Sequence, residues 1–331
     1  MKAMILRKAK APLSLEDVSL PRIGPFDVLI KVHVCGVCRT DLHIFDGELP
    51  SPHLPLILGH QVVGLVEEVG SKADPSIKGK RVGAVWLGGV CETCEFCLSG
   101  RENLCDKALF TGYQINGGYA EYFCAHQNFI LEIPQHYSDV EAAPLLCAGL
   151  IGYRAYKLAG DFESVGFYGF GSSAHLLIQV AMDLGKKVCV FTRPKDEKTQ
   201  EFARDLGAIW VGDSDTLPDQ SLDAAIIFAP DGALYPGALK ALKKGGRVIS
   251  AGIHMSDIPS FSYSLLWEER SMTSVANLTR EDGKEFMKIC GTRPLKVQTT
   301  LFPLYKANQA LETLRAGGIQ GALVLQVKDC F

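Results

Sequence analysis

The sequence predicts an α/β protein in two parts, a β-rich module followed by a doubly wound parallel sheet. Residues 1–137 contain short runs of β-branched and aromatic residues separated by glycine and proline, a pattern typical of antiparallel strands. From about residue 138, strand patterns alternate with helix patterns, which indicates a parallel sheet with crossover helices. A chain of 331 residues is also long for a single core, so two domains are expected.

We assign 1–137 and 277–331 to the first domain and 138–276 to the second. The second begins with the strand pattern SVGFY and the helix pattern SAHLLIQVAMDLG, and the alternation continues through ALYPGALKALKKGG, expected as a helix, to the strand RVISAG. The last segment combines two helix patterns with a final strand, ALVLQV. We expect that segment to return to the first domain.

The composition is that of an ordinary globular protein, with 47% hydrophobic residues, 21% charged residues and a net charge of −3. Because nucleic acids and anionic membranes attract basic patches, and none is present, neither is an expected partner. The N-terminal MKAMILRKAK lacks the apolar core of a signal peptide, and no apolar run approaches the roughly 18 residues that span a bilayer. The expected location is the cytoplasm.

Four of the eleven cysteines are closely spaced, at Cys91, Cys94, Cys97 and Cys105. In a reducing compartment such a cluster indicates a metal before it indicates disulfides. Four thiolates can complete the tetrahedral shell of a structural zinc, and this segment has too few apolar residues to fold without metal. Free thiols and an iron–sulfur cluster are the alternatives.

A second set of metal-binding residue types lies between Gly36 and His60. Cys38 and His60 offer sulfur and imidazole, the donors that suit zinc. Cys147, in APLLCAGLIGY, is a third candidate ligand. Taken alone, each has a simpler interpretation, since isolated cysteines and histidines are more often buried core residues.

The pattern Gly169-Phe-Gly171-Ser172-Ser173-Ala174 follows a predicted strand and opens a predicted helix, as in dinucleotide-binding folds. NAD enzymes usually carry an acidic residue about 20 positions later, which binds the ribose 2′-hydroxyl. Here the next strand ends in Thr192-Arg193, and Lys198 follows. A cation in place of a carboxylate favours NADP(H), with NAD as the alternative.

Taken together, these motifs resemble the zinc-dependent alcohol dehydrogenases of the medium-chain dehydrogenase/reductase family. GVCRTDLH, the GH at 59–60, the four-cysteine lobe, PLLCAGLIGY and YGFGSSAH occur in the family's order over essentially the whole chain. The resemblance implies a GroES-like catalytic domain and a Rossmann dinucleotide-binding domain. It is greatest to the yeast and bacterial enzymes for small alcohols, because WLGGVCETCEFC matches their form of the lobe.

The resemblance also implies roles for individual residues. Cys38, His60 and Cys147 are expected to hold a catalytic zinc, with Asp41 orienting the zinc histidine. Thr40 is expected to take the alcohol proton, and His43 to pass it to solvent.

Two further positions bear on the substrate and the metal. Trp86 is expected to narrow the pocket towards small primary alcohols. Simpler interpretations remain for His43, as a surface residue, and for Trp86, as part of the core. Gln61 departs from the family, which usually has glutamate directly after the zinc histidine.

The expected protein is therefore an oxidoreductase with two zinc ions per subunit that transfers hydride between a small primary alcohol or aldehyde and a nicotinamide dinucleotide. Two related alternatives are a reductase of larger aromatic or cinnamyl-type aldehydes and a non-catalytic zinc- and dinucleotide-binding scaffold. A redox switch built on the cysteine cluster is a third. The resemblance suggests a homodimer or homotetramer.

Overall fold

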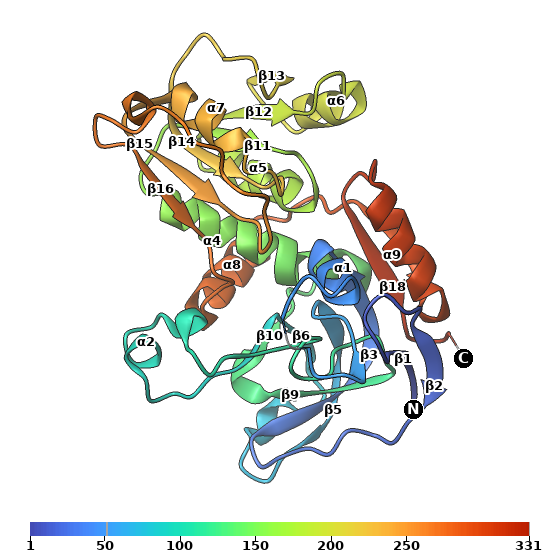
Figure 1. Ribbon diagram of the computed structural model, residues 1–331. Helices are drawn as coiled ribbons and strands as arrows, with labels where there is room; N and C mark the ends of the chain where they lie inside the picture. The colour runs from blue at the N-terminus through green and yellow to red at the C-terminus, as the bar shows by residue number, and fades with distance from the viewer. Residues whose placement is uncertain (51, 331) are drawn as a thin grey trace. The chain divides into compact units, whose positions relative to one another are not determined.

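The fold is taken from a computed structural model in which residues 1–50 and 52–330 are described (Figure 1). The chain divides into two compact units, Met1–Leu150 with Asn277–Phe331, and Ile151–Ala276. The division after Ala276 coincides with the expected domain boundary. The other division falls after Leu150 instead of after residue 137, because helix α3 (Asp139–Pro144) packs against strands of the first unit.

The first unit is built mainly from antiparallel strands. Its largest sheet has the order β10-β6-β5-β3-β18-β17, and β9 also pairs with β3. A three-stranded sheet, β2-β1-β4, and the pair β7-β8 complete it. The strands are β1 (Lys2–Leu6), β2 (Ser14–Asp17), β3 (Asp27–Val37), β4 (Leu56–Ile57), β5 (Val62–Val69), β6 (Arg81–Ala84), β7 (Leu87–Gly89), β8 (Leu109–Phe110), β9 (Tyr122–His126), β10 (Ile130–Glu132), β17 (Thr299–Pro303) and β18 (Ala322–Gln326).

The long strand β3 organises this unit, because it pairs with β5, β9 and β18. Pairing with β18 brings the C-terminal segment back to the first unit, as the sequence predicted. The described helices of the unit are short apart from two near the C-terminus: α1 (Arg39–Phe45), α2 (Glu95–Leu98), α3, α8 (Arg280–Thr292) and α9 (Ala307–Ala316). Strand β3 ends at Val37, so its end delivers Cys38 to the start of α1.

The second unit contains one parallel sheet with the strand order β13-β12-β11-β14-β15-β16. Counted from β11, this is the 3-2-1-4-5-6 order of dinucleotide-binding folds, which confirms the predicted fold class. The strands are β11 (Ser164–Tyr168), β12 (Lys187–Thr192), β13 (Trp210–Asp213), β14 (Leu222–Ile227), β15 (Leu242–Ser250) and β16 (Ser271–Ser274). The helices are α4 (Leu150–Ala159), α5 (Ser172–Asp183), α6 (Glu197–Asp205) and α7 (Leu234–Ala241).

One predicted element of this unit was too long. The helix expected over ALYPGALKALKKGG ends at Ala241, and strand β15 begins at Leu242. Leu242 is buried and pairs with Leu222 of β14, so sheet formation overrides the helix propensity of the two lysines that follow. Among the described residues, no helix is both long and apolar enough to cross a bilayer.

Candidate active site and metal sites

Cys38 and Asp41 are fixed by the way helix α1 begins. Cys38 is the N-cap residue, and Asp41 lies in the first turn. One carboxylate oxygen of Asp41 accepts a hydrogen bond from the Cys38 backbone N–H at 2.9 Å, and the other accepts from the Gly59 N–H at 3.1 Å. A carboxylate at a helix N-terminus is electrostatically favourable. Asp41 thereby joins the start of α1 to the residue that precedes His60.

His60 lies next to both of these residues and is completely buried. Its Nε2 is 3.1 Å from the Cys38 Sγ, and its Nδ1 is 3.4 Å from an oxygen of Asp41, which is also completely buried. The preceding Gly59 has φ +94°, and a Cβ there would lie 2.3 Å from the ring of Tyr119. Only glycine therefore lets the chain reach this position without moving the tyrosine.

Cys147 reaches the same place from a different part of the chain. It lies in η4 (Leu145–Gly149), a turn of π-helix between α3 and α4, and π-helical turns are frequent at functional sites. One donor atom from each of Cys38, His60 and Cys147 lies within 4.8 Å of the others. Two sulfurs and one imidazole nitrogen, with a carboxylate behind the imidazole, fit a zinc ion that keeps one position for a substrate.

The electrostatics of this cluster suit a cation. Hydrogen bonding with Cys147, together with the positive charge of His60, holds the pKa of Cys38 well below the usual thiol value despite burial. The same hydrogen bond and burial raise the pKa of Cys147. Burial lowers the pKa of His60, but the Cys38 thiolate and Asp41 outweigh it and raise the pKa to about 10. Negative charge thus collects on the Cys38 sulfur that faces His60, while burial raises the pKa of Asp41 on the other side of the imidazole.

Thr40 and His43 are three residues apart on α1, so their side chains lie on one face of the helix, and both are buried. His43 Nδ1 lies 2.5 Å from Oε2 of Glu48. This carboxylate was not predicted from the sequence, because a glutamate five residues after a histidine is not a recognised signal.

Trp86 is buried, with 7% of its surface exposed, and meets His60 edge-on at a ring distance of 5.0 Å. Phe110 and Tyr113 stack on the indole at 5.0 and 5.9 Å, two aromatic neighbours that sequence analysis did not identify. Gln61 is buried beside Gly36, where a Cβ would lie 2.7 Å from the amide oxygen. The residue after His60 is therefore a neutral amide held in the core.

The four-cysteine lobe forms a second cluster, with its sulfurs within 4.8 Å of one another. The Cys94 N–H points at the Cys91 sulfur at 3.3 Å, and the Cys91 N–H points at the Cys105 sulfur at 3.5 Å. Hydrogen bonds from Thr93 and Cys94 lower the pKa of Cys91 to about 5, whereas burial and the neighbouring thiols raise that of Cys97 to about 12. Four convergent sulfurs, of which those of Cys91 and Cys105 receive backbone N–H groups, fit a closed structural zinc site.

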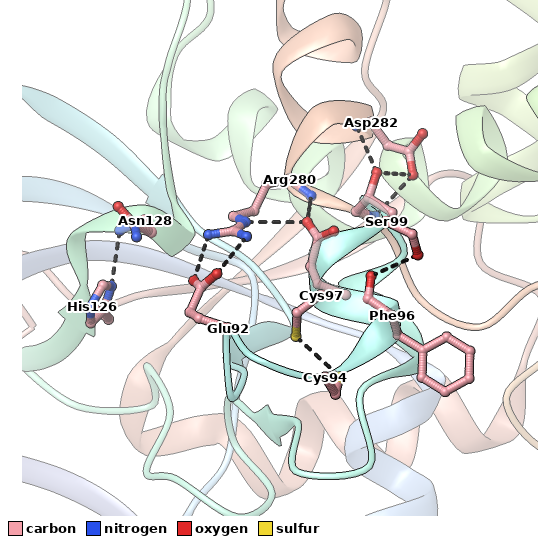
Figure 2. A network of polar contacts seen from close by, with 11 residues as sticks. Glu92, Cys94, Phe96, Cys97, Ser99, His126, Asn128, Arg280 and Asp282 are labelled. Carbon is pink, nitrogen blue, oxygen red and sulfur yellow. Dashed lines mark hydrogen bonds and ion pairs between the residues drawn. The ribbon is translucent and has the colours of Figure 1, made fainter.

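Arg280 fastens this lobe to helix α8. Its guanidinium binds both oxygens of Glu92, at 2.7 and 3.1 Å, and its backbone N–H and Nε donate to Glu102 at 2.8 and 3.2 Å (Figure 2). Helix α8 begins at this residue because Thr279 and Asp282 form a capping box. Arg280 was not predicted from the sequence, since it lies far along the chain from the cysteines that it helps to hold.

The glycine-rich turn of the second unit joins β11 to α5. Gly169 has φ +88°, and a Cβ there would lie 3.0 Å from Ala229, so this position requires glycine. At Gly171, the N-cap of α5, a Cβ would meet no atom within 4 Å. Open space in front of a helix N-terminus that begins with Ser172 and Ser173 fits a bound phosphate, and Ala174 behind them is buried.

The residues predicted to choose between NAD and NADP lie at the end of β12. Arg193 is 82% exposed and 3.7 Å from Asp196, and Lys198 is exposed on α6. The Thr192 hydroxyl is buried and accepts a hydrogen bond from Gln200, whose amide also donates to Asp213. Asp213 is paired with Thr192 across the parallel strands, a carboxylate that inspection of one strand alone could not find.

Comparison with known proteins shows which protein family has this fold and site. The profile of the alcohol dehydrogenase GroES-like domain matches residues 24–135. The "Probable alcohol dehydrogenase AdhA" of Mycobacterium tuberculosis (strain CDC 1551 / Oshkosh) is 43% identical over 325 residues, covering 96% of this chain and 93% of that protein.

Two solved structures each have a TM-score of 0.89. A cinnamyl alcohol dehydrogenase from Sorghum bicolor is 25% identical, covering 99% of this chain and 98% of the other. An acetophenone reductase from Geotrichum candidum, in complex with NAD, is 29% identical, with 99% and 97% covered.

The fold and the site define the class of protein. It is an enzyme, an oxidoreductase of alcohols and carbonyl compounds that binds zinc and a nicotinamide dinucleotide. Within that class, the chain belongs to the zinc-type alcohol dehydrogenases of the medium-chain family.

Proposed function

We propose that the protein interconverts small primary alcohols and aldehydes, with NADP(H) as hydride carrier and two zinc ions per chain. The observation that carries this proposal is the convergence of Cys38, His60 and Cys147 around one point, with Asp41 behind the histidine. The reducing cytoplasm, where thiols stay available as metal ligands, is the proposed location.

The catalytic steps are assigned to residues of the first unit. Cys38, His60 and Cys147 would hold the zinc ion, which would supply Lewis acidity at the substrate oxygen. Asp41 fixes the orientation of His60 through its Nδ1 side. Thr40 takes the hydroxyl proton of the alcohol as hydride leaves for the nicotinamide, and His43 carries that proton outward. In aldehyde reduction the same groups return the proton.

Trp86 supports the preference for small substrates, because its indole lies against the edge of His60 and is backed by two further aromatic rings. The test compares kcat/KM for ethanol, butanol, benzyl alcohol and cinnamyl alcohol in the wild type and in Trp86→Ala. We expect the wild type to favour the short alcohols and the variant to shift the ratio towards benzyl alcohol about tenfold. A wild type that favours cinnamyl alcohol would identify the larger-substrate alternative.

The NADP(H) preference rests on the exposed cation of Arg193 at the end of β12. Arg193→Ala should lower kcat/KM for NADPH about tenfold and leave that for NADH nearly unchanged. Lys240→Ala, which removes an exposed cation from α7, is the control. Higher kcat/KM with NADH than with NADPH in the wild type would reject NADP(H) and direct attention to Asp213.

A homodimer or homotetramer is proposed as the working assembly. Strand β16 lies at an edge of the parallel sheet, and Tyr263 and Trp267 just before it are 67% and 60% exposed. Exposed aromatics beside a sheet edge are typical of a subunit interface. Light scattering of the purified protein should give a mass of two or four chains, and a monomer at micromolar concentration would contradict this assignment.

A further inference from the structure

The C-terminal end of helix α1 is shaped so that one carboxylate returns to the helix. Asp46 is the C-cap residue, and Gly47 follows with φ +70°. The Gly47 N–H donates to the carbonyl of Ile44 at 3.1 Å, and the Glu48 N–H donates to the carbonyl of His43 at 2.9 Å. These two bonds form a Schellman motif, in which glycine supplies the left-handed residue. The motif places Glu48 directly over the last turn of α1.

The side chain of Glu48 then meets the imidazole of His43. Its Oε2 lies 2.5 Å from Nδ1, a short, charge-assisted hydrogen bond. The His43 side chain is 8% exposed, whereas that of Glu48 is 43% exposed. The carboxylate therefore touches a buried imidazole on one side and water on the other.

We propose that Glu48 is the exit of the proton relay, which receives the proton from His43 and releases it to water. This inference rests on the proposed roles of Thr40 and His43 in alcohol oxidation. It adds a carboxylate between the imidazole and solvent, which makes Glu48 a positioning residue with a proton-transfer role.

The transfer balances without any further reactant. The alcohol loses a hydride to the nicotinamide and a proton to the relay that begins at Thr40. His43 accepts a proton at Nε2 and gives the proton on Nδ1 to Oε2 of Glu48, from which water removes it. The Nδ1 hydrogen bond also keeps Nε2 as the unprotonated acceptor, since only one nitrogen of a neutral imidazole carries a proton.

The nearest charged groups of helix α9 act mainly on Asp46. Arg315 of α9 binds both oxygens of Asp46, at 2.7 and 2.8 Å, and its guanidinium lies over the ring of Phe45. Glu48 itself and Glu312 of α9 also act electrostatically on the same guanidinium. Asp46 is thus neutralised by Arg315, and Glu48 is the carboxylate that contacts His43.

A purely structural role for Glu48 makes a different prediction. The Schellman motif uses its backbone N–H, which every residue except proline supplies, so side-chain variants leave the motif intact. Removing the carboxylate therefore tests the effect of its contact with His43, and not the effect of the helix end.

The experiment measures kcat/KM for ethanol oxidation between pH 6 and 10 in the zinc-loaded wild type, Glu48→Gln, Glu48→Asp, His43→Gln and Asp46→Asn. We expect Glu48→Gln to lose about tenfold at pH 7, with the loss shrinking as pH rises and as concentrated imidazole buffer is added, since both supply an external proton acceptor. Glu48→Asp should keep most of the rate. Asp46→Asn, on the same turn, should match the wild type.

The outcomes separate this inference from the relay itself. If His43→Gln loses rate and Glu48→Gln does not at any pH, Glu48 has no part and the relay stands. If neither variant loses rate, both the relay proposal and the role of Glu48 fail. A loss in Glu48→Gln that buffer does not relieve, that Glu48→Asp shares and that accompanies a lower Tm would show a structural role and overturn the inference.

Discussion

The two cysteine clusters use the same chemistry in opposite structural settings. In the candidate active site, Cys38 and Cys147 are partly buried, but His60 and Asp41 are fully buried, and backbone hydrogen bonds fix the carboxylate that faces the imidazole. In the lobe, three of the four cysteines are only partly buried, and Leu98 between them is 76% exposed.

This difference indicates what a metal does in each place. The active-site donors are positioned by β3, α1 and the close contact between Gly59 and Tyr119, so the protein holds the proposed catalytic zinc. The lobe has little apolar surface to bury, so its folding depends on the proposed structural zinc. Loss of metal should therefore cost activity at the first site and local folding at the second.

The largest expected effect follows from removing an active-site donor. Cys38→Ala or Cys147→Ala should lower kcat by about 1000-fold or more, because Lewis acidity at the substrate oxygen is lost. Circular dichroism should be unchanged, and metal analysis should fall from two zinc ions per chain to one. Full activity in either variant would remove that residue from the ligand set.

The matching change in the lobe is expected to act on stability. Cys97→Ser should also remove one zinc, but it should lower Tm on the order of 5 °C and expose the segment around residues 91–105 to protease. Residual activity at 20 °C should exceed that of Cys38→Ala. If Cys97→Ser left Tm and proteolysis unchanged while kcat collapsed, the roles of the two clusters would have to be exchanged.

A smaller effect is expected from the contact that fastens the lobe to α8. Arg280→Met removes the guanidinium charge and the Nε donor from the buried Glu102, which keeps only the backbone N–H of residue 280, and it also removes both bonds to Glu92. This should cost about 2 kcal/mol and speed zinc release to a chromogenic chelator by roughly tenfold or more. Arg280→Lys should recover part of the loss. Lys284→Met, one turn along the same helix and exposed, is the control. Equal zinc release in Arg280→Met and the control would contradict the role of this contact.

Short-range sequence patterns were enough to predict the cysteine cluster of the lobe and most strands and helices of the parallel sheet. Cys91 to Cys105 lie within one short segment, so their spacing alone limits how their sulfurs can meet. The strand and helix patterns of 164–205 and the glycines at 169 and 171 likewise depend on neighbours along the chain. The failure at 242–246 shows the limit, since Leu242 pairs with Leu222 of β14 and the pairing resumes at Arg247, contacts that the local sequence does not contain.

The active site depended on tertiary structure, apart from the residue types that the family resemblance selected. Cys38, His60 and Cys147 come from three distant segments, and only the folded sheet, the capped start of α1 and a π-helical turn bring their donors within 4.8 Å. Glu48, Phe110 and Arg280 carried no motif and were found only through their contacts. Spacing along the chain specifies geometry when the linking segment is short, whereas for distant residues geometry is set by packing and hydrogen bonding throughout the fold.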